Sequence, residues 1–116
     1  MTDNECIFCK IADGRVPAGL LHEDDVCVAF HDLEPQAPTH ILIIPRKHLD
    51  SLAETNADDK ETLGHLLLTA ANIARDQGFA DNGFRTVINT NADGGQTVFH
   101  LHVHLLAGRS FVFPPG

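Results

Sequence analysis

The chain has 116 residues, 43% of them hydrophobic, which is enough for one hydrophobic core and predicts a single domain spanning residues 1–116. Its formal net charge of −8 excludes the broad basic surface that nucleic acids and anionic membranes require, so we expect neither as a partner. Residues 1–9 lack a basic segment followed by an apolar run, and no stretch reaches the length of a membrane span. We therefore expect a soluble cytoplasmic protein.

The first half of the chain predicts a short helix, a hairpin and a buried strand. Residues 7–12 can form a short N-terminal helix. The hydrophobic segments 20–23 and 26–31 flank an Asp-Asp pair that suits a tight turn, so they predict an antiparallel hairpin. Residues 40–45 contain four consecutive Ile and Leu residues, a run too short for a helix and rich in β-branched side chains. This run predicts a buried strand.

The second half predicts one long helix and two further strands. Apolar residues recur at helical spacing over residues 58–77, and Gly78 supplies a stop signal. Residues 84–90 and 98–106 have the pattern of strands. The connections between strands are short, as antiparallel neighbours allow, so the expected fold class is α+β, with an antiparallel sheet, one long helix and a short N-terminal helix. The pattern does not predict the strand order.

Three histidines, His100, His102 and His104, alternate with aliphatic residues near the end of the chain. On a strand they would point to one face at intervals of about 7 Å. A neutral imidazole is a competent nucleophile, so His102 could attack phosphorus while its neighbours bind phosphate oxygens. A zinc site of three histidines is an alternative, but its ligands normally converge from more than one element. The simplest alternative is a half-buried strand whose polar face is histidine.

A loop rich in small and polar residues precedes these histidines. Gly94 and Gly95 allow the backbone to approach a ligand, and Gln96 and Thr97 offer uncharged hydrogen-bond donors. The pattern resembles a phosphate-receiving loop, although an ordinary hairpin turn can have the same sequence pattern.

The three cysteines, Cys6, Cys9 and Cys27, are an odd number in a chain without a predicted secretory signal, which disfavours structural disulfides. Reduced thiols or metal ligands are the remaining interpretations. Cys27 lies within an apolar strand and is expected to be a small buried residue.

Several motifs in the same order resemble the histidine-triad (HIT) nucleotide-binding family, specifically its Hint branch of purine nucleoside phosphoramidases. The resemblance covers nearly the whole chain. The matching stretches are Ile7-Phe8 with Lys10-Ile11, Ala29-Phe30-His31-Asp32, Pro35-Gln36-Ala37-Pro38-Thr39-His40, Ile44-Pro45 with His48, Asp93-Gly94-Gly95-Gln96, residues 100–104, and Pro114-Pro115-Gly116.

The resemblance implies a HIT-like fold and hydrolysis of purine nucleoside 5′-phosphoramidates and aminoacyl-adenylates without a catalytic metal. His102 would form a nucleotidyl-histidine that water then hydrolyses, and His104 would hydrogen-bond the phosphate. The resemblance implies that Asn89 and Thr97 contact the phosphate or leaving group, with Gln96 beside them, and that Asp32 binds the ribose. It implies that the purine lies in an apolar pocket formed by Ile7, Phe8, Ile11, Val16, Phe30 and Leu33.

Other activities share this motif. A purine-nucleotide-binding or interaction module with incidental catalysis, a dinucleoside polyphosphate hydrolase and a metal-dependent hydrolase are the alternatives. The family also implies a homodimer with a continuous sheet, packed long helices and a C-terminal tail near the partner's site. Phe113 stands in that tail where the better-known animal members carry Trp, so the leaving group is not predicted.

Cys6 and Cys9 form a Cys-x-x-Cys pair, which many Hint proteins lack but numerous bacterial histidine-triad proteins carry as part of a zinc site. The resemblance implies His48 and His100 as the other two ligands. Such a closed Cys₂His₂ set would be structural. Free thiols and a redox pair are the alternatives, the latter without the βαβ context of a thioredoxin-like motif.

Overall fold

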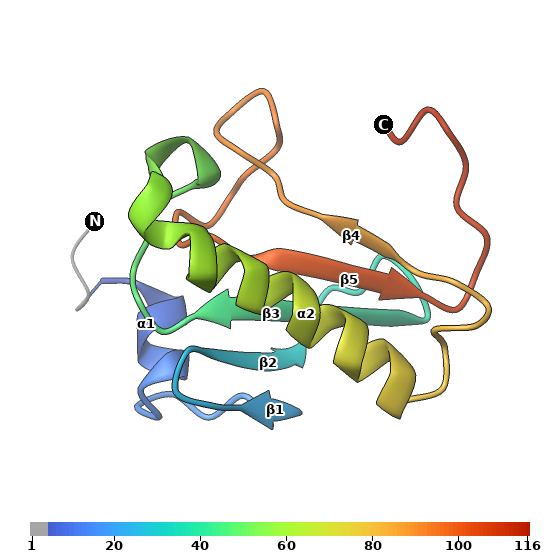
Figure 1. The fold of residues 1–116 in the computed structure, drawn as a ribbon, viewed down its shortest axis with the longest axis horizontal. Helices are drawn as coiled ribbons and strands as arrows, with labels where there is room; N and C mark the ends of the chain where they lie inside the picture. Colours follow the sequence, from blue (N-terminus) through green and yellow to red (C-terminus); the bar gives the residue numbers. More distant parts are fainter. Residues whose placement is uncertain (1–4) are drawn as a thin grey trace.

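The computed structural model describes residues 5–116 and has an antiparallel sheet of five strands in the order β1-β2-β3-β5-β4 (Figure 1). The last strand of the chain is therefore inserted between β3 and β4. The α+β class expected from the sequence is confirmed. The strand bounds are β1 His22–Glu23, β2 Cys27–His31, β3 Thr39–Pro45, β4 Arg85–Val87 and β5 Val103–Ala107.

A tight turn joins β1 to β2, as the Asp-Asp pair predicts. The side-chain oxygen Oδ1 of Asp24 accepts hydrogen bonds from the backbone N–H groups of Val26 (2.8 Å) and Cys27 (2.9 Å). Asp favours such turns because its short carboxylate reaches the backbone two and three residues further on. β1 begins at His22, two residues later than expected, although the Leu21 N–H still donates to the Ala29 carbonyl.

Two α-helices and two 3₁₀ turns complete the fold. The short helix α1 spans Ile7–Ala12, as predicted, and the Cys6 sulfur caps it by accepting from the Cys9 N–H. The long helix α2 begins at Lys60, because Asn56 caps the preceding 3₁₀ turn and keeps that segment out of the helix. The bounds are α1 Ile7–Ala12, η1 Leu52–Glu54, η2 Ala57–Asp59 and α2 Lys60–Asp76.

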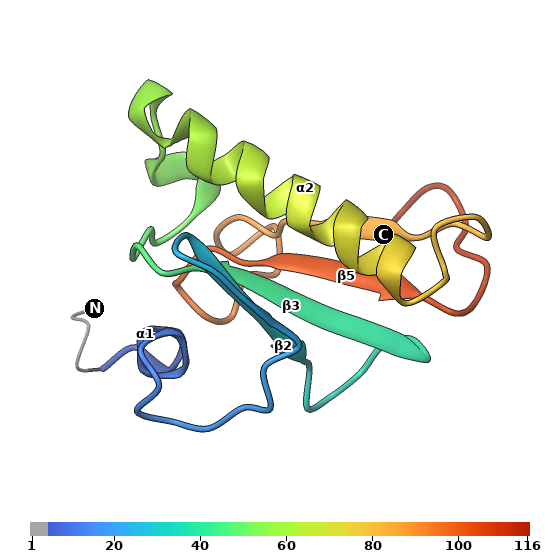
Figure 2. The same ribbon diagram turned by 60° about the horizontal axis from the view of Figure 1, so that its bottom comes forward.

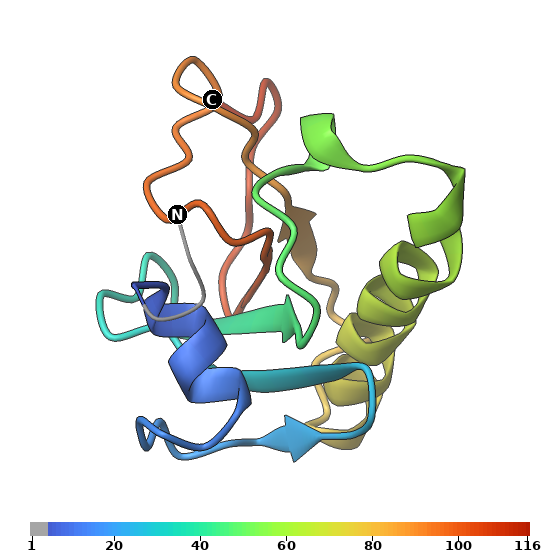
Figure 3. The ribbon, with the colours of Figure 1, turned by 90° about the vertical axis from the view of Figure 1, so that its left-hand side faces the viewer.

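The two helices cover opposite faces of the sheet (Figures 2 and 3). Alternate residues of a strand point to opposite faces, so β2 and β3 contribute to two cores. One core packs beneath α2, and the other packs beneath α1. Within β2 and β3, Ala29, Ile41 and Ile43 belong to the α2 core, whereas Phe30 and Leu42 belong to the α1 core.

The strand predicted over residues 98–106 begins only at Val103, which corrects that prediction. The backbone before it is bonded elsewhere: the Leu101 N–H donates to the Leu49 carbonyl, and the Gln96 side chain donates to the Val98 carbonyl. The strand predicted over residues 84–90 is likewise reduced to Arg85–Val87. Across residues 5–116, no helix has the length and apolar character needed to cross a membrane.

Candidate functional site

A cavity of about 650 Å³ lies on the α1 face of the sheet. Because α1, the ends of β2 and β3, the loop after the glycine pair and the start of β5 meet there, its wall combines apolar and polar side chains. The lining residues are Ile7, Phe8, Ile11, Phe30, His31, Asp32, Leu33, Glu34, Gln36, His40, Leu42, Gly95, Thr97, Val98, His102 and His104.

His102 lies immediately before β5 and is 7% exposed. Its Nδ1 is 2.8 Å from the carbonyl oxygen of His100. A carbonyl only accepts, so neutral His102 carries its proton on Nδ1 and has a lone pair on Nε2. Burial lowers the pKa of His102 below the ordinary histidine value, although the hydrogen bond to His100 and the charge of Asp32 act in the opposite direction. At neutral pH, Nε2 of His102 is therefore an available nucleophile.

His40 fixes the proton position of His104. The backbone N–H of Gln36 donates to Nδ1 of His40 (3.0 Å), so neutral His40 carries its proton on Nε2. That Nε2 is 2.9 Å from Nδ1 of His104 and 3.5 Å from a carboxylate oxygen of Asp32. Burial, opposed by Asp32 and reinforced by His102, lowers the pKa of His40. His40 therefore donates to His104, whose own proton is left on Nε2.

Nε2 of His104 has no hydrogen-bond partner, the sole buried side-chain nitrogen or oxygen so placed among residues 5–116. An unpaired buried donor costs free energy unless a ligand satisfies it. Burial, together with His102 and His40, lowers the pKa of His104 to about 4, and Asp32 only partly opposes this shift. The rings of His102 and His104 are 4.9 Å apart. The cavity thus presents a nitrogen lone pair beside an unpaired N–H donor.

His100 does not line this cavity, although it faces the same side of the sheet as His102 and His104. Leu101, Val103 and Leu105 alternate with the three histidines and pack in the α2 core, so the three histidines share one face, as predicted. Nδ1 of His100 is 3.2 Å from the sulfur of Cys6 and 3.4 Å from that of Cys9, so its ring is directed to these thiols and not into the cavity.

Cys6, Cys9, His48 and His100 form a second cluster, whose four ligand atoms all lie within 4.8 Å of one another. The Cys9 sulfur is 3.2 Å from Nδ1 of His48. Nε2 of His48 donates to Asp50 (2.6 Å), and Nε2 of His100 donates to the Pro45 carbonyl (2.8 Å). Both imidazoles therefore direct an Nδ1 lone pair towards the thiols, which is the orientation that such outer partners impose on metal-binding histidines. The donor set fits a tetrahedral zinc ion.

Most of the residues that the resemblance assigns to substrate lie around the cavity. Ile7, Phe8, Ile11, Phe30, Asp32, Leu33 and Thr97 line it together with His102 and His104. Val16 packs against the α1 core instead, and Asn89 and Gln96 are not among the lining residues. The Gln96 amide is occupied in the loop, where it accepts from the Asn91 N–H and donates to the Asp50 and Val98 carbonyls.

His40 is the site residue that the sequence assignment missed. It ends the Pro-Gln-Ala-Pro-Thr-His motif and is 4% exposed, and its contact with His104 follows from the pairing of β3 with β5. The signal available in the sequence was that motif.

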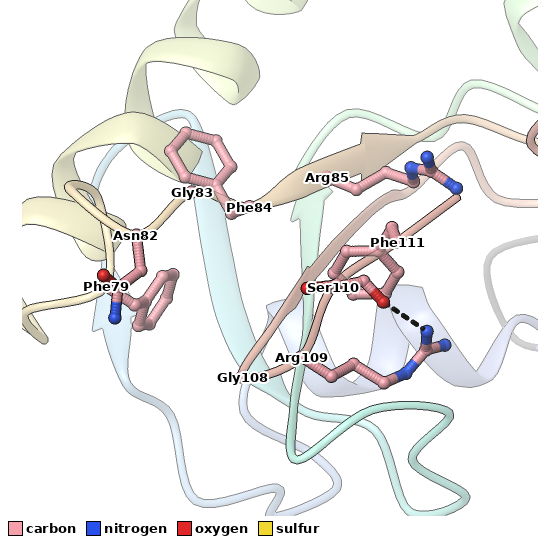
Figure 4. Close-up of a pocket in the computed structure, with 9 residues that line it drawn as sticks. All are labelled: Phe79, Asn82, Gly83, Phe84, Arg85, Gly108, Arg109, Ser110 and Phe111. Atoms are coloured by element: carbon pink, nitrogen blue, oxygen red, sulfur yellow. Dashed lines mark hydrogen bonds between the residues drawn. The ribbon is translucent and has the colours of Figure 1, made fainter. Parts of the chain in front are cut away.

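A further hollow of about 710 Å³ lies beside β4 (Figure 4). The guanidinium groups of Arg85 and Arg109 both lie over the ring of Phe111, at 5.2 and 4.3 Å from its centroid. The lining contains no thiol, imidazole or carboxylate; its polar side chains are those of Asn82, Arg85, Arg109 and Ser110. The lining residues are Phe79, Asn82, Gly83, Phe84, Arg85, Gly108, Arg109, Ser110 and Phe111.

Residues 13–111 match the HIT domain. The chain belongs to the HIT domain family. An uncharacterized HIT-like protein of Synechococcus elongatus is 53% identical over 112 residues, 97% of both chains. The fold of this HIT protein superposes on the crystal structure of a HIT family hydrolase from Legionella pneumophila with a TM-score of 0.94 and 48% identity, covering 97% of this chain and 100% of the other. A histidine triad protein from Clostridium difficile gives a TM-score of 0.92 and 45% identity, covering 97% of each chain.

Proposed function

We propose that this HIT protein hydrolyses purine nucleoside 5′-phosphoramidates and aminoacyl-adenylates through a covalent bond between phosphorus and Nε2 of His102. One observation carries the proposal: backbone partners leave a lone pair on His102 next to an unpaired N–H on His104. That pair suits attack on a phosphorus atom whose oxygens need a donor. The name of the Legionella pneumophila neighbour, a HIT family hydrolase, supports hydrolysis as the reaction type.

In the first step, Nε2 of His102 attacks the α-phosphorus while the bond from phosphorus to the leaving group breaks. An amine leaves with a proton taken from solvent, whereas the amino acid of an aminoacyl-adenylate leaves as a carboxylate. The His104 N–H donates to a phosphate oxygen. The imidazole becomes cationic, and its Nδ1–H remains bonded to the His100 carbonyl, which stabilises that charge. In the second step, water attacks phosphorus, neutral His102 departs, and a nucleoside monophosphate and a proton are released.

The shape of the cavity supports a purine nucleoside. Its volume lies in the range of small-molecule sites, and Ile7, Phe8 and Phe30 give it an apolar wall on which a base can pack. One oxygen of Asp32 accepts from the Glu34 N–H (2.8 Å), which orients the carboxylate at the cavity wall. We assign Asp32 to the ribose hydroxyls, which are hydrogen-bond donors.

The test is single-turnover incubation with an adenosine 5′-phosphoramidate, followed by a quench that avoids acid and by mass analysis. The wild type is expected to gain the mass of one nucleotidyl group and to release the amine, whereas His102→Ala should do neither. Gln77→Ala is the control, because it also removes one polar side chain but lies at the end of α2, across the sheet from the cavity and outside every proposed site. Nucleotide binding without an adduct in the wild type would indicate a binding module instead.

We also propose that Cys6, Cys9, His48 and His100 hold a structural zinc ion. Zinc there would tie α1 to the segment after β3 and to the segment before β5. Four protein ligands would fill all the coordination positions of a tetrahedral zinc ion, so the ion would have no position open for substrate and no part in the reaction at His102. Removing the metal with a strong chelator is expected to lower the melting temperature, and restoring zinc should raise it again. An unchanged melting temperature in protein shown to contain the metal would contradict the proposal.

A homodimer is proposed from two surfaces. β4 is an edge strand, and an unpaired edge is a template for pairing with another strand. On α2, an apolar stripe with a helical spacing of three and four residues faces away from the core: Gly64, Leu67, Leu68 and Ala71. Leu68 is 65% exposed, and Val112 and Phe113 of the tail are 76% and 87% exposed. Pairing two copies along β4 and α2 would cover these side chains.

A further inference from the structure

Another cluster of metal-ligating side chains, separate from that of Cys6, Cys9, His48 and His100, lies on the α2 side of the sheet. It consists of His22 of β1, Asp24 of the hairpin turn, Cys27 of β2 and His65 of α2. It shares no residue with the Cys6 cluster or with the triad cavity, and the sheet separates it from the α1 core. His22, Asp24 and Cys27 come together there from two strands and a turn, and His65 reaches Asp24 from α2, as the residues of a metal site do when the fold brings them together.

The donor atoms are close together. Oδ2 of Asp24 is 2.7 Å from Nε2 of His22 and 2.8 Å from Nε2 of His65. The Cys27 sulfur is 3.7 Å from the same oxygen. The ligand atoms of His22, Asp24 and Cys27 all lie within 4.8 Å of one another. One carboxylate oxygen is therefore the common neighbour of two imidazoles and a thiol.

Outer partners hold two of these donors in place. The other oxygen of Asp24 accepts the two backbone N–H groups of the turn, so Oδ2 alone faces the cluster. The Thr69 hydroxyl lies 3.6 Å from the Cys27 sulfur, where it can donate to a thiolate. Such outer contacts are characteristic of metal ligands, because they fix the direction of the lone pairs.

The charge and exposure of the cluster also suit a cation. Within residues 5–116, no lysine or arginine side chain pairs with this carboxylate. The side chains of His22 and His65 are 35% and 39% exposed, so an ion can reach them from solvent and they can adjust around it.

We propose that His22, Asp24 and His65, with Cys27 as the buried fourth ligand, bind a divalent ion of the zinc class. Imidazole, carboxylate and thiolate are the ligands that zinc and cobalt accept in tetrahedral sites. In the absence of an ion each Nε2–H donates to Oδ2 of Asp24, so a bound ion replaces both hydrogen bonds: each neutral imidazole exchanges its proton with solvent from Nε2 to Nδ1 and turns its Nε2 lone pair to the ion. Binding displaces the thiol proton of Cys27, which is released to solvent.

The test is a titration of metal-free, untagged protein with Co²⁺, with equilibrium dialysis to count the bound equivalents and absorption spectroscopy to detect cobalt–thiolate bonds. The wild type is expected to bind two equivalents. The double variant His22→Gln/His65→Gln should bind one, and Cys6→Ser/Cys9→Ser should also bind one, with thiolate absorption that Cys27→Ser reduces. Circular dichroism confirms that each variant is folded.

Two matched variants control for adventitious binding. His31→Gln removes an exposed histidine outside the cluster, and Asp25→Asn removes the neighbouring carboxylate of the same turn. Both should still bind two equivalents. The proposal is overturned if the wild type binds a single equivalent that Cys6→Ser/Cys9→Ser abolishes, or if His22→Gln/His65→Gln binds as much cobalt as the wild type. The second result leaves the zinc proposal for Cys6 and Cys9 untouched.

Discussion

His102, the proposed nucleophile, takes its orientation from the backbone. In many catalytic triads a carboxylate holds the reacting histidine. Here a backbone carbonyl holds Nδ1 of His102, and a backbone N–H holds Nδ1 of His40 at the far end of the chain of imidazoles. Because peptide groups do not titrate near neutral pH, the proton positions of His102 and His40 are preserved while the side chains around them change charge.

Replacing His40 is expected to slow adduct formation. His40→Ala removes the donor to Nδ1 of His104, so the His104 proton is no longer confined to Nε2. A lost hydrogen bond of about 1 kcal/mol corresponds to a decrease of about fivefold in the single-turnover rate. His40→Gln keeps a side-chain N–H donor and should recover part of that rate. Equal rates for wild type and His40→Ala would show that His40 does not position His104.

Stability is expected to fall with pH below about 6.5. The folded pKa of His104 is about 4, below the ordinary value of 6.5, so the unfolded chain takes up this proton first. The contribution of neutral His104 to the free energy of unfolding is therefore fully present above pH 6.5 and is lost as the pH falls from 6.5 through 4. Urea denaturation between pH 7 and pH 4 gives the free energy of unfolding as a function of pH, and the slope of that plot reports the protons taken up on unfolding. His104→Gln should reduce this uptake by up to one proton.

At the scale of elements, the loop before the triad depends on a close backbone approach. A Cβ atom on Gly94 would lie 2.4 Å from the Thr90 carbonyl oxygen and 2.8 Å from the Thr90 nitrogen. The loop closes on itself at this point, and its next residues include Gly95 and Thr97 of the cavity wall. The glycine therefore sets the path of the backbone that reaches the cavity wall beside His102.

Gly94→Ala is expected to lower activity more than stability. The added methyl group must push Thr90 away, which displaces the loop while both cores beneath α1 and α2 stay packed. We expect at least a tenfold loss in the rate of adduct formation, or about 1.4 kcal/mol in the barrier. Asn91→Gly is the control in the same loop, because Asn91 already has a φ of 59° that glycine adopts freely. A normal rate in Gly94→Ala would contradict this role.

The elements that could be predicted from the sequence were those with local signals. α1 was predicted at its observed bounds, and the apolar spacing of α2 located that helix within two residues of its start. The strand over residues 98–106 was wrong in its first half, because hydrogen bonds to the Leu49 carbonyl and the Gln96 side chain compete with strand pairing there. Such long-range bonds leave no periodicity in the sequence. The strand order could not be predicted for the same reason, because it depends on pairing between residues far apart in the chain.

The candidate site likewise contains residues that could be predicted from local motifs and residues that could not. The motifs predicted a cavity lined by Phe8, Asp32 and His102, but the role of His40 depends on the register that puts Leu42 opposite His104. The second metal cluster could not be predicted, because His22 and His65 are 43 residues apart and meet only through Asp24.

At the scale of the whole molecule, the net charge of −8 opposes the approach of an anionic substrate. Specific donors must compensate for this repulsion, and the unpaired N–H of His104 is one of them. Under the proposed function, recognition of the substrate would therefore be confined to the cavity.

The proposed dimer is expected to depend on Leu68. Leu68→Glu places a charge in the middle of the apolar stripe on α2, where it would have to be buried without a partner. Multi-angle light scattering should show a dimer for the wild type and a monomer for the variant. Leu21→Glu makes the same change at the opposite edge of the sheet and should stay dimeric. A wild type that is monomeric, or a Leu68→Glu variant that still dimerises, would rule out this interface.

His100 takes part in both centres on this side of the molecule: its ring faces Cys6 and Cys9, and its carbonyl holds His102. A sample whose thiols have oxidised should therefore contain a subset of molecules with a misplaced nucleophile. In a pre-steady-state experiment this mixture would reduce the amplitude of the burst and leave its time constant unchanged. Active-site titration, rather than protein concentration, is then the proper basis for comparing preparations of different age.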